Sequence, residues 1–208
     1  YLSSVNKKLK DHFIKLSKRI KKYKFIVDIG SNDGILLEPL KKLGLNAIGI
    51  DPSVNVGKIA NKKGLKTFIG FFDNKMIKKI LNKYSKPDLV VASSVITHME
   101  NPIRFAKDIK SFIMENGVLI IEIEYLKNFI KNLEFERFYF DRPFYYSARS
   151  VEILFKKVGM NLFDIEKIDI HGESLRCFIK NENSNFKTKR CQNILKEEKE
   201  YLNYKILK

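Results

Sequence analysis

Residues Phe25–Leu37 read FIVDIGSNDGILL and contain the signals of one β–α unit. A short apolar run predicts a buried strand, a glycine-rich turn follows it, and an apolar-periodic segment predicts a helix after the turn. Glycine at Gly30 and Gly34 lets the backbone approach a ligand closely, because no side chain stands in the way. Asp28, at the end of the strand, adds a hydrogen-bond acceptor. The stretch therefore predicts a ligand-binding turn at the edge of a sheet.

The spacing within this turn excludes two common nucleotide motifs. Ser31 and Asn32 follow Gly30, so the dinucleotide pattern G-x-G-x-x-G is missing, and no Gly-Lys-Ser/Thr closes a Walker loop. The pattern D-x-G-x-x-x-G instead resembles the opening of the cofactor fold in S-adenosylmethionine (SAM)-dependent methyltransferases. On this resemblance we expect Asp28 to accept from the cofactor's ammonium, directly or through water, and the turn residues Gly30, Asn32 and Gly34 to contact the cofactor. A tight turn in some other α/β domain is the alternative.

A second carboxylate strengthens the SAM interpretation. Residues Asn46–Pro52 predict another buried strand, which ends on Asp51, 21 residues after Gly30. In a parallel sheet this strand end lies beside the first, so Asp51 would accept both ribose hydroxyls of an adenosyl group. The alternative is that Asp51 only caps the helix expected over residues 54–63.

Length and composition indicate one domain of ordinary size with a substantial core, since 44% of the 208 residues are hydrophobic. No apolar stretch is long enough to span a bilayer and the start lacks a signal-peptide pattern, so we expect no membrane insertion. Cys177 and Cys191 lack metal-ligand spacing. We therefore predict no metal and a cytoplasmic protein with free thiols.

The formal charge of +16 raises the question of nucleic-acid binding. Only 7 of the 40 basic residues are arginine, and they form no dense cluster. Arginine is the better reader of phosphates and bases, so we expect the lysine excess to cover solvated helix faces and predict no nucleic-acid partner. The positive field would still favour an anionic substrate.

Alternating strands and helices predict an α/β fold: a single, doubly wound, Rossmann-like methyltransferase sheet with helices on both faces and a C-terminal antiparallel hairpin. The expected organisation is an N-terminal helical segment (1–24), a SAM-binding domain (25–182) and a charged C-terminal helix (183–208). In chain order the predicted elements are helix 2–22, strand 25–29, helix 38–43, strand 46–51, helix 54–63, strand 66–69, helix 75–84, strand 88–92, helix 103–114, strand 117–124, helices 125–133 and 147–158, strands 162–168 and 174–179, and helix 186–208.

Four further residues complete the predicted cofactor site. Phe71 and Phe72 follow the third strand, where an adenine ring could stack, although two adjacent aromatic residues also suit the core. Ala92 and Ser93 end the fourth strand, and His98 follows shortly after. All of these positions fall at the predicted carboxyl ends of the strands, where ligands bind such sheets.

With these residues in place, the chain resembles a known family over almost its whole length: the sugar C-methyltransferases of deoxysugar biosynthesis. The blocks that carry the resemblance are Tyr1–Ser4 with Asp11–Phe13, Val27–Gly34, Ala92–His98, Gly117–Glu122 and His171–Arg176. The SNDG and HG-x-SLR blocks are fairly specific in combination.

Two departures from the family pattern limit what the resemblance implies. Family members usually carry an N-terminal zinc module with clustered cysteines and often a further C-terminal domain, and on this sequence we expect neither. Where the family has Tyr-x-His-Glu-His, this chain reads Tyr139-Phe140-Asp141-Arg142-Pro143, with one acid kept and both histidines gone. A SAM-dependent methyltransferase is still expected, but C-methylation of a keto sugar does not follow.

Methyl transfer to a hydroxyl or carbon acid needs a base, and histidine suits this task near neutral pH. We predict His98 as the base, with Tyr139 and Asp141 as further catalytic residues; orienting the loop is the alternative role of His98. Arg142 and Tyr145 are predicted substrate ligands, although Asp141 and Arg142 could form only a surface pair.

The block at His171–Arg176 supplies the last two candidates. His171 would contact the substrate or only cap a strand turn with Gly172. Arg176 would bind a phosphate or diphosphate bidentately, or else form an ion pair at the sheet edge.

Together these observations predict methyl transfer from SAM to a small anionic precursor, with a nucleotide-activated sugar of surface-polysaccharide biosynthesis and O-methylation favoured. The alternatives are C-methylation of a keto sugar, a nucleic-acid methyltransferase and a non-catalytic SAM-binding domain. The fourth strand lacks the Asn/Asp-Pro-Pro-aromatic motif of amino-methylating enzymes and has no nearby cysteine, which weakens the nucleic-acid alternative. The oligomeric state stays open.

Overall fold

The computed structural model describes residues 2–170 and 172–202, and its packing forms two compact units. One unit holds the described residues up to Ala92 together with Ser111–Val118, and the other holds Ser93–Lys110 and the described residues from Leu119 onward. The predicted segment 25–182 therefore contributes to both. The strand order is β3-β2-β1-β4-β5-β7-β6. Within the part of the chain that the structure describes, no helix is long and apolar enough to cross a membrane.

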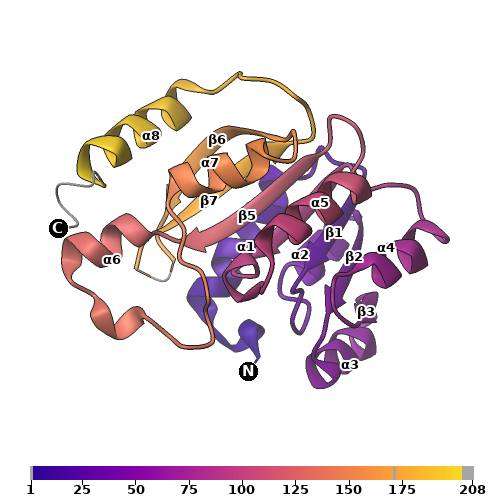
Figure 1. The fold of residues 1–208 in the computed structure, drawn as a ribbon. Helices are drawn as coiled ribbons and strands as arrows, with labels where there is room; N and C mark the ends of the chain where they lie inside the picture. The colour runs from indigo at the N-terminus through magenta and orange to yellow at the C-terminus, as the bar shows by residue number, and fades with distance from the viewer. Residues whose placement is uncertain (1, 171, 203–208) are drawn as a thin grey trace. The chain divides into compact units, whose positions relative to one another are not determined.

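The first unit is built on parallel strands in the order β3-β2-β1-β4, drawn in indigo to magenta in Figure 1. Its central strand β1 is fully buried, because every residue of FIVDI except Asp28 is apolar. Helix α2 packs on β2, and α3 packs on β2 and β3. The elements are η1 (Ser3–Val5), α1 (Lys7–Arg19), β1 (Phe25–Ile29), α2 (Leu37–Lys42), β2 (Asn46–Asp51), α3 (Val54–Lys62), β3 (Thr67–Ile69), α4 (Asn74–Leu81) and β4 (Leu89–Ser93).

The second unit pairs β6 with β7 in antiparallel register, so that Ile165 lies opposite Cys177. Helices α7 and α8 pack on β6 and on each other (Figure 1). Its elements are η2 (Ile96–His98), α5 (Pro102–Phe112, whose last two residues belong to the first unit), β5 (Val118–Glu124), α6 (Leu126–Asn132), η3 (Phe135–Arg137), α7 (Ala148–Lys156), β6 (Asn161–Ile168), β7 (Ser174–Lys180) and α8 (Lys189–Tyr201).

Most predicted elements are found with ends shifted by a few residues, and both ends of the chain differ more. The helix expected over residues 2–22 is η1 followed by the shorter α1, because Asn6 has extended backbone and its side chain caps α1 by accepting from the Leu9 amide. The helix expected over residues 186–208 begins only at Lys189, where Thr188 accepts from the Cys191 amide. Residues 203–208 lie outside the described part of the chain.

Candidate functional site

The glycine-rich turn has left-handed backbone at three positions. Gly30, Asn32 and Gly34 have φ values of 73°, 49° and 86°. The amides of Gly30 and Ser31 donate to the Ile50 carbonyl at 2.8 and 3.2 Å, which binds the turn to the end of β2. A Cβ added at Gly34 would also collide with the Leu65 side chain, so this position requires glycine for two independent reasons.

Asp51 joins the turn to the segment after β2. Its Oδ2 accepts from the Asn32 amide and its Oδ1 from the Ser53 amide, both at 2.8 Å, and the residue is only 6% exposed. The N-cap of α3 is Ser53, not Asp51, so the interpretation of Asp51 as a helix cap is wrong. A carboxylate has about four acceptor positions, and two bonds leave capacity for a ligand.

The polar residues Asn32 and Asp33 are bound by the N-terminal segment. The Ser3 amide donates to Asn32 Oδ1 at 3.1 Å, and the Ser4 amide donates to Asp33 Oδ1 at 3.2 Å. The Ser4 hydroxyl donates to the other oxygen of Asp33, and Lys63 Nζ lies 3.3 Å from it. These side chains therefore shape the turn, and a cofactor contact of Asn32 stays a prediction.

The first unit has two carboxylates, those of Asp28 and Asp51, whose chemistry suits the predicted cofactor. Asp28 is buried in β1 in register with Gly49, and Asp51 ends the neighbouring strand β2. Two carboxylates at a turn with open backbone suit an ammonium group and a ribose diol. The Ser31 hydroxyl is also buried and has no hydrogen-bond partner among the described residues.

The other predicted cofactor residues have different surroundings. Phe71 is 74% exposed and its ring is accessible for stacking, whereas Phe72 lies edge-on to the buried Phe112 ring with centroids 5.5 Å apart, which favours a core role. Ala92 is fully buried in β4. The Ser93 hydroxyl donates to Glu122 Oε2 at 2.8 Å in the second unit.

In the second unit, His98 contacts the residue that replaces the family's histidine-rich motif. Its Nδ1 lies 3.1 Å from the Asp141 carbonyl oxygen and 3.9 Å from the Asp141 carboxylate. A carbonyl oxygen only accepts, so Nδ1 carries the proton and Nε2 is the acceptor of the neutral ring. The side chain of His98 is 42% exposed, which leaves this nitrogen a route to a ligand.

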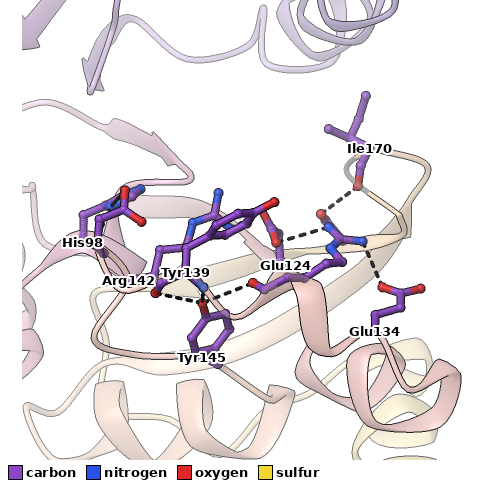
Figure 2. A network of polar contacts seen from close by, with 10 residues as sticks. His98, Glu124, Glu134, Tyr139, Arg142, Tyr145 and Ile170 are labelled. Atoms are coloured by element: carbon purple, nitrogen blue, oxygen red, sulfur yellow. Dashed lines mark hydrogen bonds and ion pairs between the residues drawn. The ribbon is translucent and has the colours of Figure 1, made fainter.

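Glu124, the last residue of β5, binds two arginines of the segment 134–145 after α6, which is called the loop below (Figure 2). Its Oε1 lies 2.5 Å from Arg142 Nη1 and its Oε2 lies 3.1 Å from Arg137 Nη2. The Tyr145 hydroxyl accepts from the Tyr139 amide at 2.6 Å and lies 3.2 Å from the Arg137 carbonyl. Arg142 and Tyr145, predicted as substrate ligands, thus hold the loop together, and Arg142 is already paired with a carboxylate.

The loop also includes Glu134, which lies 3.1 Å from Arg137 Nη1. A hydrogen bond from Asn132 lowers the pKa of Glu134 below its usual value, and the bond and charge of Arg137 act in the same direction. Glu134 therefore stays ionised at neutral pH and adds a second carboxylate beside Arg137.

Arg176 lies in β7 and is nearly buried between two strand carboxylates. Its Nε and Nη2 both lie 2.7 Å from Glu122 Oε1 on β5, and its Nη1 lies 3.4 Å from Glu166 Oε2 on β6. This geometry favours the ion pair at the sheet over the predicted phosphate ligand. His171, the other residue predicted from the same block, lies outside the described residues.

Neither cysteine is suited to act as a nucleophile. Cys177 and Cys191 are both free and buried. Burial raises the pKa of the Cys177 thiol, and it raises that of Cys191 to about 12. Neither thiol is a thiolate at neutral pH.

Two residues of the loop network, Glu124 and Arg137, were missed by the sequence analysis. Glu124 closes an apolar strand pattern, and this pattern predicts a strand residue without indicating a further role. The one available signal was a charged residue at the carboxyl end of a buried strand, which is where ligand-binding side chains collect in such sheets.

Comparisons with known proteins agree with the predicted fold. A family model described as a methyltransferase domain matches residues 1–165. A SAM-dependent methyltransferase of Thermotoga maritima, described as a possible histamine N-methyltransferase, superposes with a TM-score of 0.63 at 22% identity and covers 84% of this chain and 89% of its own. Magnesium protoporphyrin IX methyltransferase of Synechocystis, solved with S-adenosylhomocysteine, has a TM-score of 0.63 at 14% identity, covering 82% of each chain.

Two relatives differ in the atom that they methylate. C-methyltransferase NovU of Streptomyces niveus is 26% identical over 153 residues, which is 74% of this chain and 36% of the relative. The mitochondrial ubiquinone biosynthesis O-methyltransferase of Rattus norvegicus is 33% identical over 103 residues, 46% of this chain and 29% of the relative. The chain thus spans about a third of the length of these relatives.

These matches confirm the predicted Rossmann-like fold and the predicted cofactor, S-adenosylmethionine. The family match covers both the glycine-rich turn and the His98 segment. The chain therefore belongs to the methyltransferase-domain family and is a class I, SAM-dependent methyltransferase domain.

Proposed function

We propose that the protein methylates a hydroxyl oxygen of a small molecule, with His98 as the general base. The observation that carries this proposal is the 3.1 Å contact between His98 Nδ1 and the Asp141 carbonyl, which leaves Nε2 to take the hydroxyl proton. Bound SAM supplies an electrophilic methyl group. The protein must align the acceptor oxygen with it and remove one proton.

The proposed acceptor is a nucleotide-activated sugar or a related precursor of a surface polysaccharide. Support comes from the SNDG and HG-x-SLR blocks, which resemble those of the sugar methyltransferases, and from the similarity to NovU. The formal charge of +16 favours an anionic acceptor through long-range attraction. Arg142 and Arg176 already face carboxylates, so lysines are the better candidates for phosphate contacts.

Oxygen is favoured over carbon because of the loop at residues 139–143. Methylation beside a ketone needs a base for a weak acid and stabilisation of an enolate, which a histidine-rich motif can supply. Here Asp141 and Arg142 stand in that place, and Arg142 cannot accept a proton. The O-methyltransferases among the relatives are consistent with this choice.

Turnover of SAM should be measured against a panel of nucleotide sugars, with structured RNA as a control acceptor, and the product characterised by NMR. We expect the new methyl on oxygen; a methyl on carbon would contradict the proposal and restore the C-methyltransferase alternative. SAM binding without turnover on any acceptor would favour a non-catalytic domain, and turnover on RNA alone a nucleic-acid methyltransferase.

The His98→Ala variant tests the base directly. It should lower kcat by about 10²–10⁴, the range for a lost general base, with little change in SAM affinity. The matched control is His12→Ala, because His12 lies on α1 with its ring edge-on to Phe13. Equal kcat for the His98 and His12 variants would remove His98 from the mechanism.

A further inference from the structure

One peptide group, between Asp141 and Arg142, has both of its polar atoms bonded. Its carbonyl oxygen accepts from His98 Nδ1 at 3.1 Å, and its amide, that of Arg142, donates to the Tyr139 carbonyl at 3.1 Å. The orientation of this peptide group therefore sets which imidazole nitrogen carries the proton. If the group rotated, the carbonyl would leave Nδ1 and both tautomers would become accessible.

The side chain of Arg142 anchors this peptide group to a strand. Its Nη1 lies 2.5 Å from Glu124 Oε1, and its guanidinium stacks 5.0 Å from the centre of the Tyr139 ring. Glu124 is the last residue of β5 and is 7% exposed, so its position is fixed by the strand ladder and by burial. Charge-assisted bonds of this kind are short and directional.

The same carboxylate also anchors the start of the loop. Glu124 Oε2 lies 3.1 Å from Arg137 Nη2, and the Arg137 guanidinium lies 4.5 Å from the Phe129 ring centre. The Tyr145 hydroxyl then bridges the Arg137 carbonyl, at 3.2 Å, to the backbone of Tyr139 (Figure 2). One buried carboxylate thus holds two guanidiniums, and without its charge these two cations would repel each other.

We propose that Glu124 is a positioning residue that acts through Arg142 and the Asp141–Arg142 peptide group to keep His98 in the tautomer with its proton on Nδ1. Glu124 does not contact the acceptor or the methyl group. Its contribution to turnover rests on the proposed role of His98 as the base, but its effect on the His98 ring exists with or without that role.

The test is Glu124→Gln, which keeps the shape of the side chain and removes its charge. Nitrogen-15 NMR of the imidazoles, with the His98 signals assigned through His98→Ala, should show His98 moving from one tautomer to a mixture. We expect kcat to fall roughly 10- to 100-fold, the scale for a misplaced catalytic group, while the Kd for SAM stays within about twofold of wild type.

The matched control is Asp164→Asn. Asp164 is also a largely buried strand carboxylate that holds a guanidinium, that of Arg190, with Nε at 3.1 Å from Oδ1, but it lies on β6 and bonds Thr188 and Arg190 near the start of α8. We expect it to lower the melting temperature and to leave the His98 tautomer as in wild type. An equal tautomer shift in both variants would overturn the proposal, because general loss of stability would explain it.

Arg142→Gln removes the other partner of the Glu124–Arg142 ion pair and replaces Glu124→Gln in the test if that variant does not fold. It should give the same tautomer mixture, and Glu124→Gln/Arg142→Gln should shift the ring no further than either single change. An unchanged His98 tautomer in these variants would overturn the positioning role. A His98→Ala variant with wild-type kcat would instead overturn the proposed function and leave the tautomer result standing.

Discussion

The carboxylate of Asp51 binds the backbone at two places. Its two oxygens accept from the amides of Asn32 and Ser53, so the carboxylate fixes the turn and the segment after β2 at the same time. Two further acceptor positions are the ones proposed for the ribose hydroxyls of SAM. A substitution here should therefore affect stability and affinity together.

We expect Asp51→Ala to weaken SAM binding by roughly 10- to 100-fold, because loss of the acceptor leaves buried ligand hydroxyls unpaired at about 1–3 kcal/mol. Isothermal titration calorimetry below the melting temperature of the variant measures the change. The control is Asp73→Ala, which removes the N-cap of α4, a bond from the Met76 amide at 2.8 Å, and should cost about 1 kcal/mol of stability. Its SAM affinity should equal that of wild type; the claim is lost if Asp51→Ala binds as tightly.

At the scale of elements, α8 contributes more than a charged surface. Its Glu198 is only 2% exposed and accepts from the amides of Ala148 and Arg149, at 2.7 and 2.8 Å, in the first turn of α7. A carboxylate at a helix N-terminus satisfies amides that have no partner inside the helix and complements the helix dipole. Helix α8 therefore holds α7 by its end as well as by its packed face.

Glu198→Ala should lower the free energy of unfolding by about 1–3 kcal/mol, since two amides lose their acceptor in a buried place. Urea denaturation followed by circular dichroism measures the difference. Glu38→Ala is the control: Glu38 on α2 is partly exposed and pairs with the exposed Lys42 one turn later, so its loss should cost about 0.5 kcal/mol or less. Equal losses for the two variants would rule out the capping role.

At the scale of the whole molecule, the positive charge and the arginines have separate roles. Four arginines of the second unit pair with carboxylates at or near strands: Arg137, Arg142, Arg176 and Arg190. These guanidinium groups, the side chains best suited to bind phosphates, are therefore already engaged in ion pairs within the protein. The remaining excess is mostly lysine. Such a surface attracts anions at long range, and lysine is a poorer reader of phosphates and bases than arginine.

We therefore expect structured RNA or duplex DNA to bind with a Kd weaker than about 1 μM at physiological salt, because binding of this kind is non-specific and strongly screened. Fluorescence anisotropy over a salt series measures both affinity and its salt dependence. Sub-micromolar binding at physiological salt with a steep slope would show that the lysines form a nucleic-acid site, and the small-molecule proposal would have to be abandoned.

The sequence alone determined most of the elements and the glycine-rich turn, because both depend on local patterns. Every residue of FIVDI except Asp28 is apolar, and Gly30 and Gly34 permit the positive φ that the turn adopts, so a β–α turn follows from neighbours within ten residues. The position of Asp51 at a strand end was predicted from the sequence, although its bond to the Asn32 amide was not.

Only the tertiary structure decided which charges pair. Arg176 and Glu122 are 54 positions apart, Arg142 and Glu124 are 18 apart, and Lys63 and Asp33 are 30 apart. Ion pairs have no periodic signature in a sequence, since any arginine can serve any carboxylate that the strand order brings near. The sequence therefore offered the residues of the loop beside His98 only as separate candidates for catalysis and binding. The structure shows them as one network, because β5 places Glu124 between Arg137 and Arg142.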